Sequence, residues 1–243
     1  MDTTRDDPLE LPLRDKILRL TDKVFGRLEQ QIASPRRVRF REGFLFRYKE
    51  QSIKQALGLH AADCLLVAGF LQEQGALLRM LDEINEDVLF LATASEPAGL
   101  TALHQRYLAA FNEDQSSEMI DPSRPVKGPD SPKRKQIRKY TREVPGAGGP
   151  DSFADAAVAK AYSGYVHAAS QNVMEMYDGT PPRFQVLGQA GTSLQMDHAR
   201  DMWNYLYRSY GSFIVAAKVF GDQSSLDLLM RHLPSLDERM ATL

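Results

Sequence analysis

Apolar residues recur every three or four positions along nearly every long segment of this chain, the spacing of one face of an α-helix. The most regular stripe contains Ile53, Leu57, His60, Cys64, Val67 and Leu71. Its steps alternate between four and three residues, a heptad pattern that is too short for a long coiled coil and suits one helix of a bundle. We expect this face, with His60 and Cys64, to point into the core rather than to bind a metal.

The other stripes predict an all-α fold, a multi-helix bundle with at most a short extended segment at 183–188. In the first half of the chain we expect a helix that carries Leu13 to Leu28, a helix at 77–91 after an interruption at Gly75, and a helix with Ser95 as its N-cap and Pro97 in its first turn. In the second half we expect a helix that begins with the cap Ser152-x-x-Asp155 and ends at Gly179. An aromatic-rich helix capped by Thr192-x-x-Gln195 and a last helix after Asp222 follow it.

Residues 116–150 differ from their surroundings because proline and glycine are frequent there, at Pro122, Pro125, Pro129, Pro132, Pro145 and in "PGAGGP". Such a composition is typical of a linker. The chain is therefore predicted to be a single helical domain over 1–243, with 116–150 as a flexible linker or insertion.

Composition excludes several classes of protein. Of the 243 residues, 43% are hydrophobic and the net charge is −2, so the chain as a whole offers no attraction to nucleic acid or to anionic lipid. A single cysteine excludes a disulfide framework and a multi-cysteine zinc site. Without a signal peptide or an apolar run long enough to span a bilayer, the chain is expected to be cytoplasmic and to have no membrane partner.

No motif in the chain predicts a cofactor or a metal. A phosphate-binding glycine loop, a Gly-x-Ser-x-Gly elbow and the Glu-x-x-His pairs of a di-iron bundle are all missing from the sequence. We therefore predict no cofactor and no metal, and whether the chain is an enzyme stays open.

One candidate polar cluster joins two predicted helices. On a helix over 161–170, Ser163 and His167 lie away from the apolar side that contains Tyr162, and a histidine near neutral pH can act as an acid, a base or a ligand. Arg79 and Glu83 are four residues apart on another helix. Two interpretations stay open: a solvated face on each helix, or an inward Arg79–Glu83 pair that holds a buried cluster with His167.

The stretches "EQGALLRMLDE" and "YSGYVH" (162–167) resemble a bacterial all-helical family of unknown function, whose members pair an R-x-x-x-E helix with a later Tyr/Ser/His helix. The resemblance covers about residues 45–95 and 155–178. It implies Arg79, Glu83, Tyr162, Ser163 and His167 as a candidate catalytic cluster. It also implies a loose relation to the HEPN group, whose active members are ribonucleases of toxin and phage-defence systems, although no arginine stands four to six residues before any histidine here.

Two basic segments are candidates for binding nucleic acid. The first contains Arg36, Arg37, Arg39 and Arg41 interleaved with aromatic residues, and the second contains Lys133, Arg134, Lys135, Arg138 and Lys139 within the predicted linker. Basic and aromatic side chains together can bind phosphates and stack on bases. The alternative is that these cations match acidic stretches of the same chain, such as 82–87.

Two functions follow from these observations. The chain is either a nucleic-acid-associated protein of a prokaryotic defence or toxin-type system, with RNA or another anionic partner, or a non-catalytic helical interaction or dimerisation protein. In the second case the aromatic helix at 203–220 would pack in a homodimer or against a partner. Asp197, His198 and Asp201 also form a polar patch, which we attribute to the favourable placement of acids near a helix start.

Overall fold

The described residues of the computed structural model are 15–20, 23, 42–95, 99–116, 130–144, 160–179 and 181–242, and most of them are helical. The elements are α2 (Glu42–Ala68), α3 (Leu71–Ala92), the 3-10 turn η1 (Thr93–Ser95), α4 (Ala102–Ser116), α5 (Arg134–Glu143), α7 (Ser170–Met174), β1 (Tyr177–Gly179), β2 (Pro182–Phe184), α8 (Ser193–Phe220) and α9 (Gln223–Thr242). Residues 15–20 and 160–166 are also helical. The predicted all-α class is confirmed.

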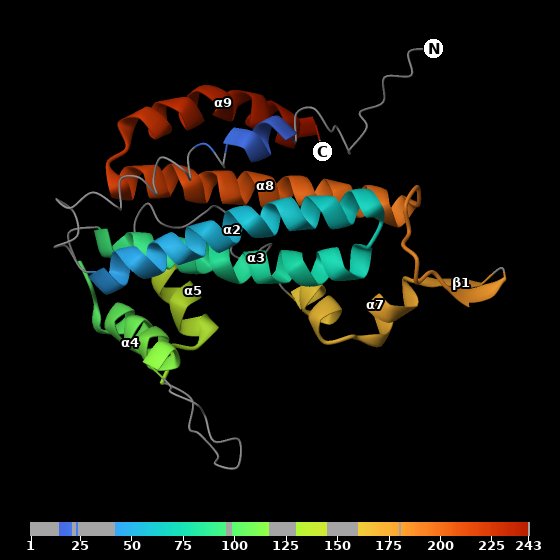
Figure 1. The fold of residues 1–243 in the computed structure, drawn as a ribbon, viewed down its shortest axis with the longest axis horizontal. Helices are drawn as coiled ribbons and strands as arrows, with labels where there is room; N and C mark the ends of the chain where they lie inside the picture. The colour runs from blue at the N-terminus through green and yellow to red at the C-terminus, as the bar shows by residue number, and fades with distance from the viewer. Residues whose placement is uncertain are drawn as a thin grey trace.

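Three long helices, α2, α3 and α8, run side by side and form the body of the molecule (Figure 1). The α9 helix lies along α8, and the helical residues 15–20 lie beside it. The α4 and α5 helices are at one end of the body, whereas α7 and the β-hairpin are at the other (Figure 1).

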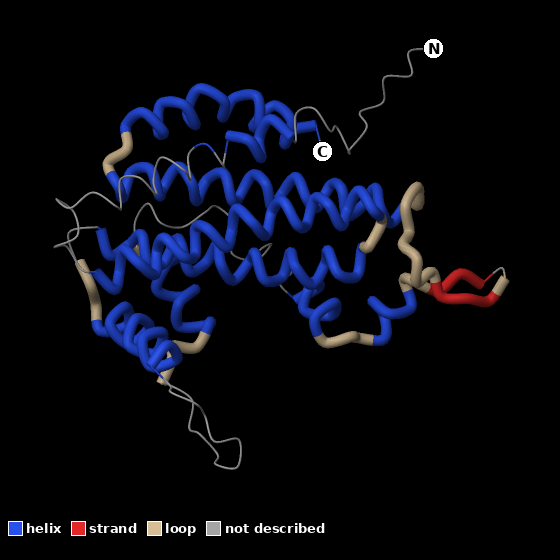
Figure 2. Tube along the Cα trace, viewed as in Figure 1, coloured by secondary structure: helices blue, strands red, loops and turns tan. Residues whose placement is uncertain are grey.

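The two strands form an antiparallel hairpin that extends away from the helices (Figure 2). Tyr177 is opposite Phe184, with ring centroids 5.4 Å apart, and Asp178 is opposite Arg183. Because alternate residues of a strand point to opposite faces, the hairpin has one aromatic face and one charged face.

The core is built largely from the aromatic helix α8. Its fully buried side chains include Trp203, Tyr210 and Phe213, which pack with residues of α2 and α3 such as Leu59 and Phe90. The aromatic stripe at 203–220, which was expected to pack in a homodimer or against a partner, is thus largely buried within the chain itself.

The predicted ends of two helices are confirmed. The Thr192 hydroxyl accepts a hydrogen bond from the Gln195 backbone N–H at 3.2 Å, which caps the start of α8. The Asp222 carboxylate accepts one from the Ser225 backbone N–H at 3.1 Å and caps the start of α9. Gly221 lies between α8 and α9 and has a φ of 64°. It ends α8 in the left-handed conformation, which glycine adopts without strain.

The predicted interruption at Gly75 is wrong, because the chain reverses earlier, at Gly69. Gly69 has a φ of 79°, and a Cβ there would lie 2.4 Å from the backbone nitrogen of Ala190. Gly75 lies inside α3, where its missing side chain makes room for the ring of Tyr165. A glycine in a helical pattern thus marked a close packing contact and not a break.

The predicted helix ending at Gly179 is also interrupted, at residues 167–169. Ala168 has a φ of 49°, and the Ala169 N–H donates to the Gly164 carbonyl at 2.9 Å, as in a helix C-terminal motif. Asn172 then folds back so closely that a Cβ on Gly164 would lie 2.0 Å from its Oδ1. Ser152 and Asp155, the predicted cap, lie outside the described residues.

Two further differences concern residues 95–150. The α4 helix begins at Ala102 and not at Ser95, which ends η1, and the Thr101 N–H donates to His104 Nδ1 at 3.2 Å. The predicted linker contains the ordered helix α5, which packs on α3. Residues 117–129 and 145–150 of that linker lie outside the described residues.

Candidate functional site

The five residues of the predicted catalytic cluster lie in different surroundings. Arg79 and Glu83 form an ion pair with an N–O distance of 2.8 Å on α3. Tyr162 is buried and donates its hydroxyl proton to Asp201, and Ser163 is half-buried. His167 is exposed, directly after the helical residues 160–166. Within the described part of the chain, no hydrogen bond or ion pair joins the His167 side chain to Arg79 or Glu83. These surroundings agree with a solvated face at His167.

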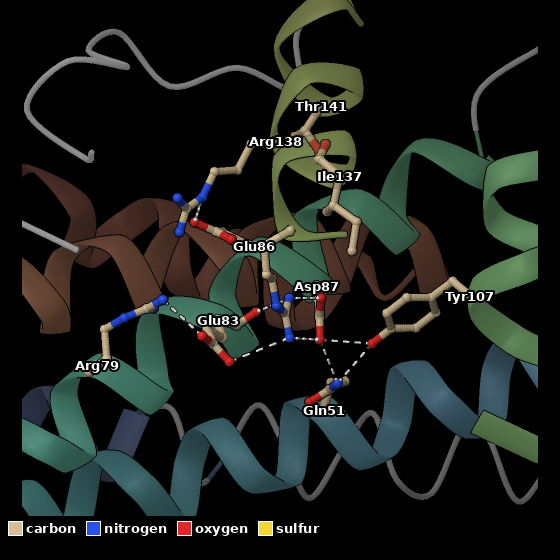
Figure 3. A network of polar contacts seen from close by, with 10 residues as sticks. Gln51, Arg79, Glu83, Glu86, Asp87, Tyr107, Ile137, Arg138 and Thr141 are labelled. Atoms are coloured by element: carbon tan, nitrogen blue, oxygen red, sulfur yellow. Dashed lines mark hydrogen bonds and ion pairs between the residues drawn. The ribbon is translucent and has the colours of Figure 1, made fainter. Parts of the chain in front are cut away.

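The acidic face of α3 is covered by α5 through a network of ion pairs (Figure 3). At its centre, Asp87 has a side chain only 2% exposed. Its carboxylate accepts hydrogen bonds from Gln51 Nε2 at 2.9 Å, from the Tyr107 hydroxyl at 2.7 Å and from both terminal nitrogens of Arg134. Asp87 thus joins α2, α4 and α5 to α3, and four donors compensate for the burial of its charge.

The rest of α5 extends this attachment. Arg138 pairs with Glu86, and Ile137, which is buried, packs against α3 beside it (Figure 3). Burial raises the pKa of Glu86, and the Arg138 guanidinium opposes that rise. Arg134 also lies 3.7 Å from a carboxylate oxygen of Glu83.

The two predicted nucleic-acid-binding segments therefore have different outcomes. In the second segment, Arg134 and Arg138 bind carboxylates of α3, as the alternative interpretation expected, whereas Lys133, Lys135 and Lys139 are exposed. The side chains of the first segment, Arg36, Arg37, Arg39 and Arg41, lie outside the described residues.

A second polar cluster surrounds His198, near the start of α8. His198 is 3% exposed; its Nδ1 lies 2.6 Å from Gln74 Oε1, and its Nε2 lies 3.0 Å from the Tyr165 hydroxyl. The same hydroxyl donates to Glu175 Oε2 at 2.8 Å. Burial lowers the pKa of His198 to about 4, against a weak opposing effect of Asp197, so the ring is neutral at pH 7.

The hydrogen bonds of this cluster assign the tautomer of His198. Gln74 Oε1 can only accept a hydrogen bond, so this orientation of the amide requires the ring proton of His198 to be on Nδ1. The unprotonated Nε2 of His198 then competes with Glu175 for the one hydroxyl proton of Tyr165. Gln74 Nε2 is then a buried donor without a partner. Turning the amide removes the competition for that proton: Gln74 Nε2 donates to Nδ1, Nε2–H of His198 donates to Tyr165, and Tyr165 donates to Glu175. The Gln74 carbonyl oxygen then takes the position without a partner, in place of the amide donor. We assign this arrangement, a chain of hydrogen bonds from the core to the half-buried Glu175.

Sequence reasoning missed this cluster because it treated His198 and Asp201 as a patch at a helix start. Tyr162 and Tyr165 are three residues apart, and so are His198 and Asp201. Two helices that lie antiparallel bring such pairs together, with Tyr162 on Asp201 and Tyr165 on His198. The matched spacing of the two pairs was the signal in the sequence. Burial also raises the pKa of Asp201.

The heptad stripe of α2 faces solvent, so the prediction that it forms the core is wrong. Leu57 is 66% exposed, Val67 is 49% exposed, Cys64 is exposed and His60 is half-buried. We call these four residues the outer seam. Two small exposed residues, Ala61 and Ala68, lie next to it. Of the two remaining heptad positions, Leu71 is buried at the start of α3, and the side chain of Ile53 lies outside the described ones.

The opposite face of α2 contacts the core instead. It contains Gln51, Gln55, Leu59, Ala62 and Leu66, all buried. The two glutamines are hidden because α3 and α4 offer partners: Gln51 binds Asp87 and Tyr107, and Gln55 Nε2 donates to Asn85 at 3.3 Å. A glutamine with buried partners can lie in a core, and its presence disguised the inner face in the sequence.

Further exposed apolar residues lie at the hairpin end of the molecule. They are Phe70, Val166, Met174, Tyr177, Phe184, Val186 and Leu187, the last 91% exposed. The loop that carries Val186 and Leu187 lies on the end of α2, because the Gln189 N–H donates to the Gly69 carbonyl at 2.8 Å and Gly188 approaches the Ala68 carbonyl. The outer seam therefore ends next to a second apolar surface.

Comparisons with protein-family models, with curated proteins and with solved structures find no match to this chain. In the described residues, none of the helices combines the length and apolar character needed to cross a bilayer. The same residues contain no group of three or more histidine, cysteine or acidic side chains that could hold a metal ion.

Proposed function

We propose that this chain is a non-catalytic helical interaction protein, and that the outer seam of α2 is the surface on which a partner helix packs. The observation that carries the proposal is the exposure of a heptad stripe. Single exposed apolar residues are common on proteins, but Leu57, Cys64 and Val67 form a row along one helix.

Heptad spacing is the pattern with which a helix receives another helix. Steps of three and four keep the seam residues facing a neighbour that crosses at about 20°, where each side chain fits between those of the other helix. Ala61 and Ala68, exposed beside the seam, allow the two backbones to approach closely. The partner we propose is therefore an amphipathic helix with its own heptad stripe.

The two polar clusters support a structural role in this proposal. Asp87 binds groups from α2, α4 and α5, and His198 connects α3, α8 and the helical residues 160–166. Both therefore hold the helices in one arrangement and keep α2 in place for a partner.

The test uses a designed helical peptide of about three heptads with leucine at both core positions. We expect labelled peptide to bind the full chain, measured by fluorescence anisotropy, and Leu57→Asp or Val67→Asp to weaken binding by about tenfold or more. Met230→Asp is the matched control, since Met230 is 48% exposed on α9, away from the seam. Equal binding by all variants, or none by the wild type, would overturn the proposal.

A second candidate function, in the defence or toxin-type setting that the resemblance implies, is association with RNA. The observation in its favour is that Lys135, Lys139 and Arg142 are exposed at steps of four and three on one side of α5. Phosphate contacts of this kind make affinity fall with salt. If RNA binds here, changing Lys135→Glu and Lys139→Glu should lower the slope of log affinity against log salt by about one for each lysine; an unchanged slope would exclude this face.

A further inference from the structure

We propose that the outer edge of β1 (Tyr177–Gly179) binds an extended segment of a partner protein as a third, antiparallel strand. From its N-terminus, this segment carries an aromatic, a basic and a β-branched residue. The surface is separate from the outer seam, so it adds a second binding site and does not depend on the first.

The hairpin is too small to be a complete sheet. Its two strands have three residues each and extend away from the helices (Figure 2). All of their residues except Asp178 are exposed. A two-stranded sheet is only marginally stable in water, and independent stability needs a third strand or a packed helix. The free edge of a strand is the template on which such a strand pairs.

The hydrogen bonds of the hairpin indicate which backbone groups point outward. The Gln185 N–H donates to the Met176 carbonyl at 2.8 Å, and these two residues lie opposite each other in the register of the hairpin. Hydrogen-bonded pairs alternate with non-hydrogen-bonded pairs along an antiparallel ladder. Because Met176 bonds across to the second strand, the next residue that does so is Asp178. The N–H and C=O groups of Tyr177 and Gly179 therefore point away from β2.

The two edges of the hairpin differ in the groups that they offer. In the described residues, the main chain of Tyr177 and of Gly179 makes no hydrogen bond on the outer side. The outer edge of β1 thus presents an N–H and a C=O from each of these residues. The edge of β2 presents fewer free groups, because Pro182 has no N–H and the Phe184 carbonyl accepts from the Val186 N–H at 3.0 Å. A third strand therefore pairs with β1.

The aromatic face of β1 selects two side chains of the added strand. Of the described residues, only Tyr177 has an atom within 4 Å of a Cβ built on Gly179, at 3.9 Å. An aromatic side chain on a neighbouring strand covers such an edge glycine. Tyr177 contacts Phe184 on one side and is still 41% exposed. Since aromatic and β-branched residues form favourable pairs across strands, a β-branched residue suits the position opposite Tyr177.

The middle residue of β1 selects a basic partner residue and disfavours a second copy of this chain. Asp178 lies on the other face of the hairpin, opposite Arg183, and a lysine of the added strand would face it from the other side. Full overlap of two β1 strands would instead place two Asp178 side chains opposite each other, where like charges repel. Antiparallel pairing reverses the order along β1, so the aromatic residue comes first in the partner and the β-branched one last.

The test is an NMR titration of the isotope-labelled full chain with a peptide of about six residues whose centre is Trp-Lys-Val. We expect the amide signals of Tyr177 and Gly179 to move to lower field, because each N–H gains a hydrogen bond. In this register the N–H groups of the tryptophan and valine point at β1, and that of the lysine points away. N-methylation of the valine should therefore weaken binding by about fivefold or more, whereas N-methylation of the lysine, the matched control, should not.

Two further comparisons test the order of the side chains and the edge itself. The reversed peptide Val-Lys-Trp should bind more weakly, and so should wild-type peptide to Gly179→Pro, which removes an outward N–H but no bond between the two strands. Equal losses from the two N-methyl groups, or equal binding of the reversed peptide, would overturn the proposal. Unperturbed signals of Tyr177 and Gly179 at about 1 mM peptide would do the same. Leu57→Asp should leave this binding intact, so failure here and failure of the outer seam are distinguishable.

Discussion

Replacing the buried His198 by glutamine should remove a loss of stability that the protein suffers between pH 7 and pH 5. In the folded chain, burial lowers the pKa of His198 to about 4 from an ordinary value of 6.5. The unfolded imidazole takes up a proton as the pH falls below 6.5, and the folded one stays neutral until about pH 4. The unfolded state therefore binds more protons in this window, and stability falls with falling pH.

The size of the effect follows from the same two values. By this linkage, the free energy of unfolding is lower by about 2 kcal/mol at pH 5 than at pH 7. Below pH 4 the loss caused by His198 reaches its limit of about 3 kcal/mol. Glutamine can keep a hydrogen bond to Gln74 or Tyr165 but does not titrate. Asp197, Asp201 and Glu175, the acids near the ring, are present in both proteins, so the comparison isolates the imidazole.

Urea unfolding at pH 7, 6 and 5 measures this for the wild type and His198→Gln. The difference in the free energy of unfolding between the two proteins should change by about 2 kcal/mol in favour of the variant as the pH falls. The absolute stability of the variant at pH 7 does not matter for the test. A difference that stays constant to within about 0.5 kcal/mol across this range would refute the burial of a neutral His198.

Three further substitutions test the packing around α3 and α8. Gly75→Ala should destabilise the fold by about 1–3 kcal/mol, because its Cβ would lie 2.6 Å from the ring of Tyr165. Gly211→Ala, with nothing within 4 Å of the added Cβ, should instead stabilise α8 by about 0.5–1 kcal/mol. An equal loss of stability in the two alanine variants would contradict the close packing at Gly75. Tyr107→Phe should cost about 2 kcal/mol by removing a donor to the buried Asp87. Thermal or urea unfolding measures all three, and an unchanged midpoint for Tyr107→Phe would contradict the network.

The sequence by itself determined the fold class and several helix ends. Helical spacing of apolar residues predicted the helices, and the caps at Thr192 and Asp222 are where the residue types place them. These features depend on contacts between residues three or four apart, which spacing alone describes. The ion pair between Arg79 and Glu83 is also a contact between residues four apart.

The tertiary structure decided which face of each helix is buried. The heptad stripe with Leu57 and Val67 was expected inside, yet the face with Gln51 and Gln55 is there, because buried partners on α3 and α4 satisfy both amides. Likewise, His198 is a core residue only because Tyr165, distant in sequence, lies against it. Whether a polar residue is buried depends on the hydrogen-bond partners that other elements provide. The spacing of residues within one helix does not indicate those partners.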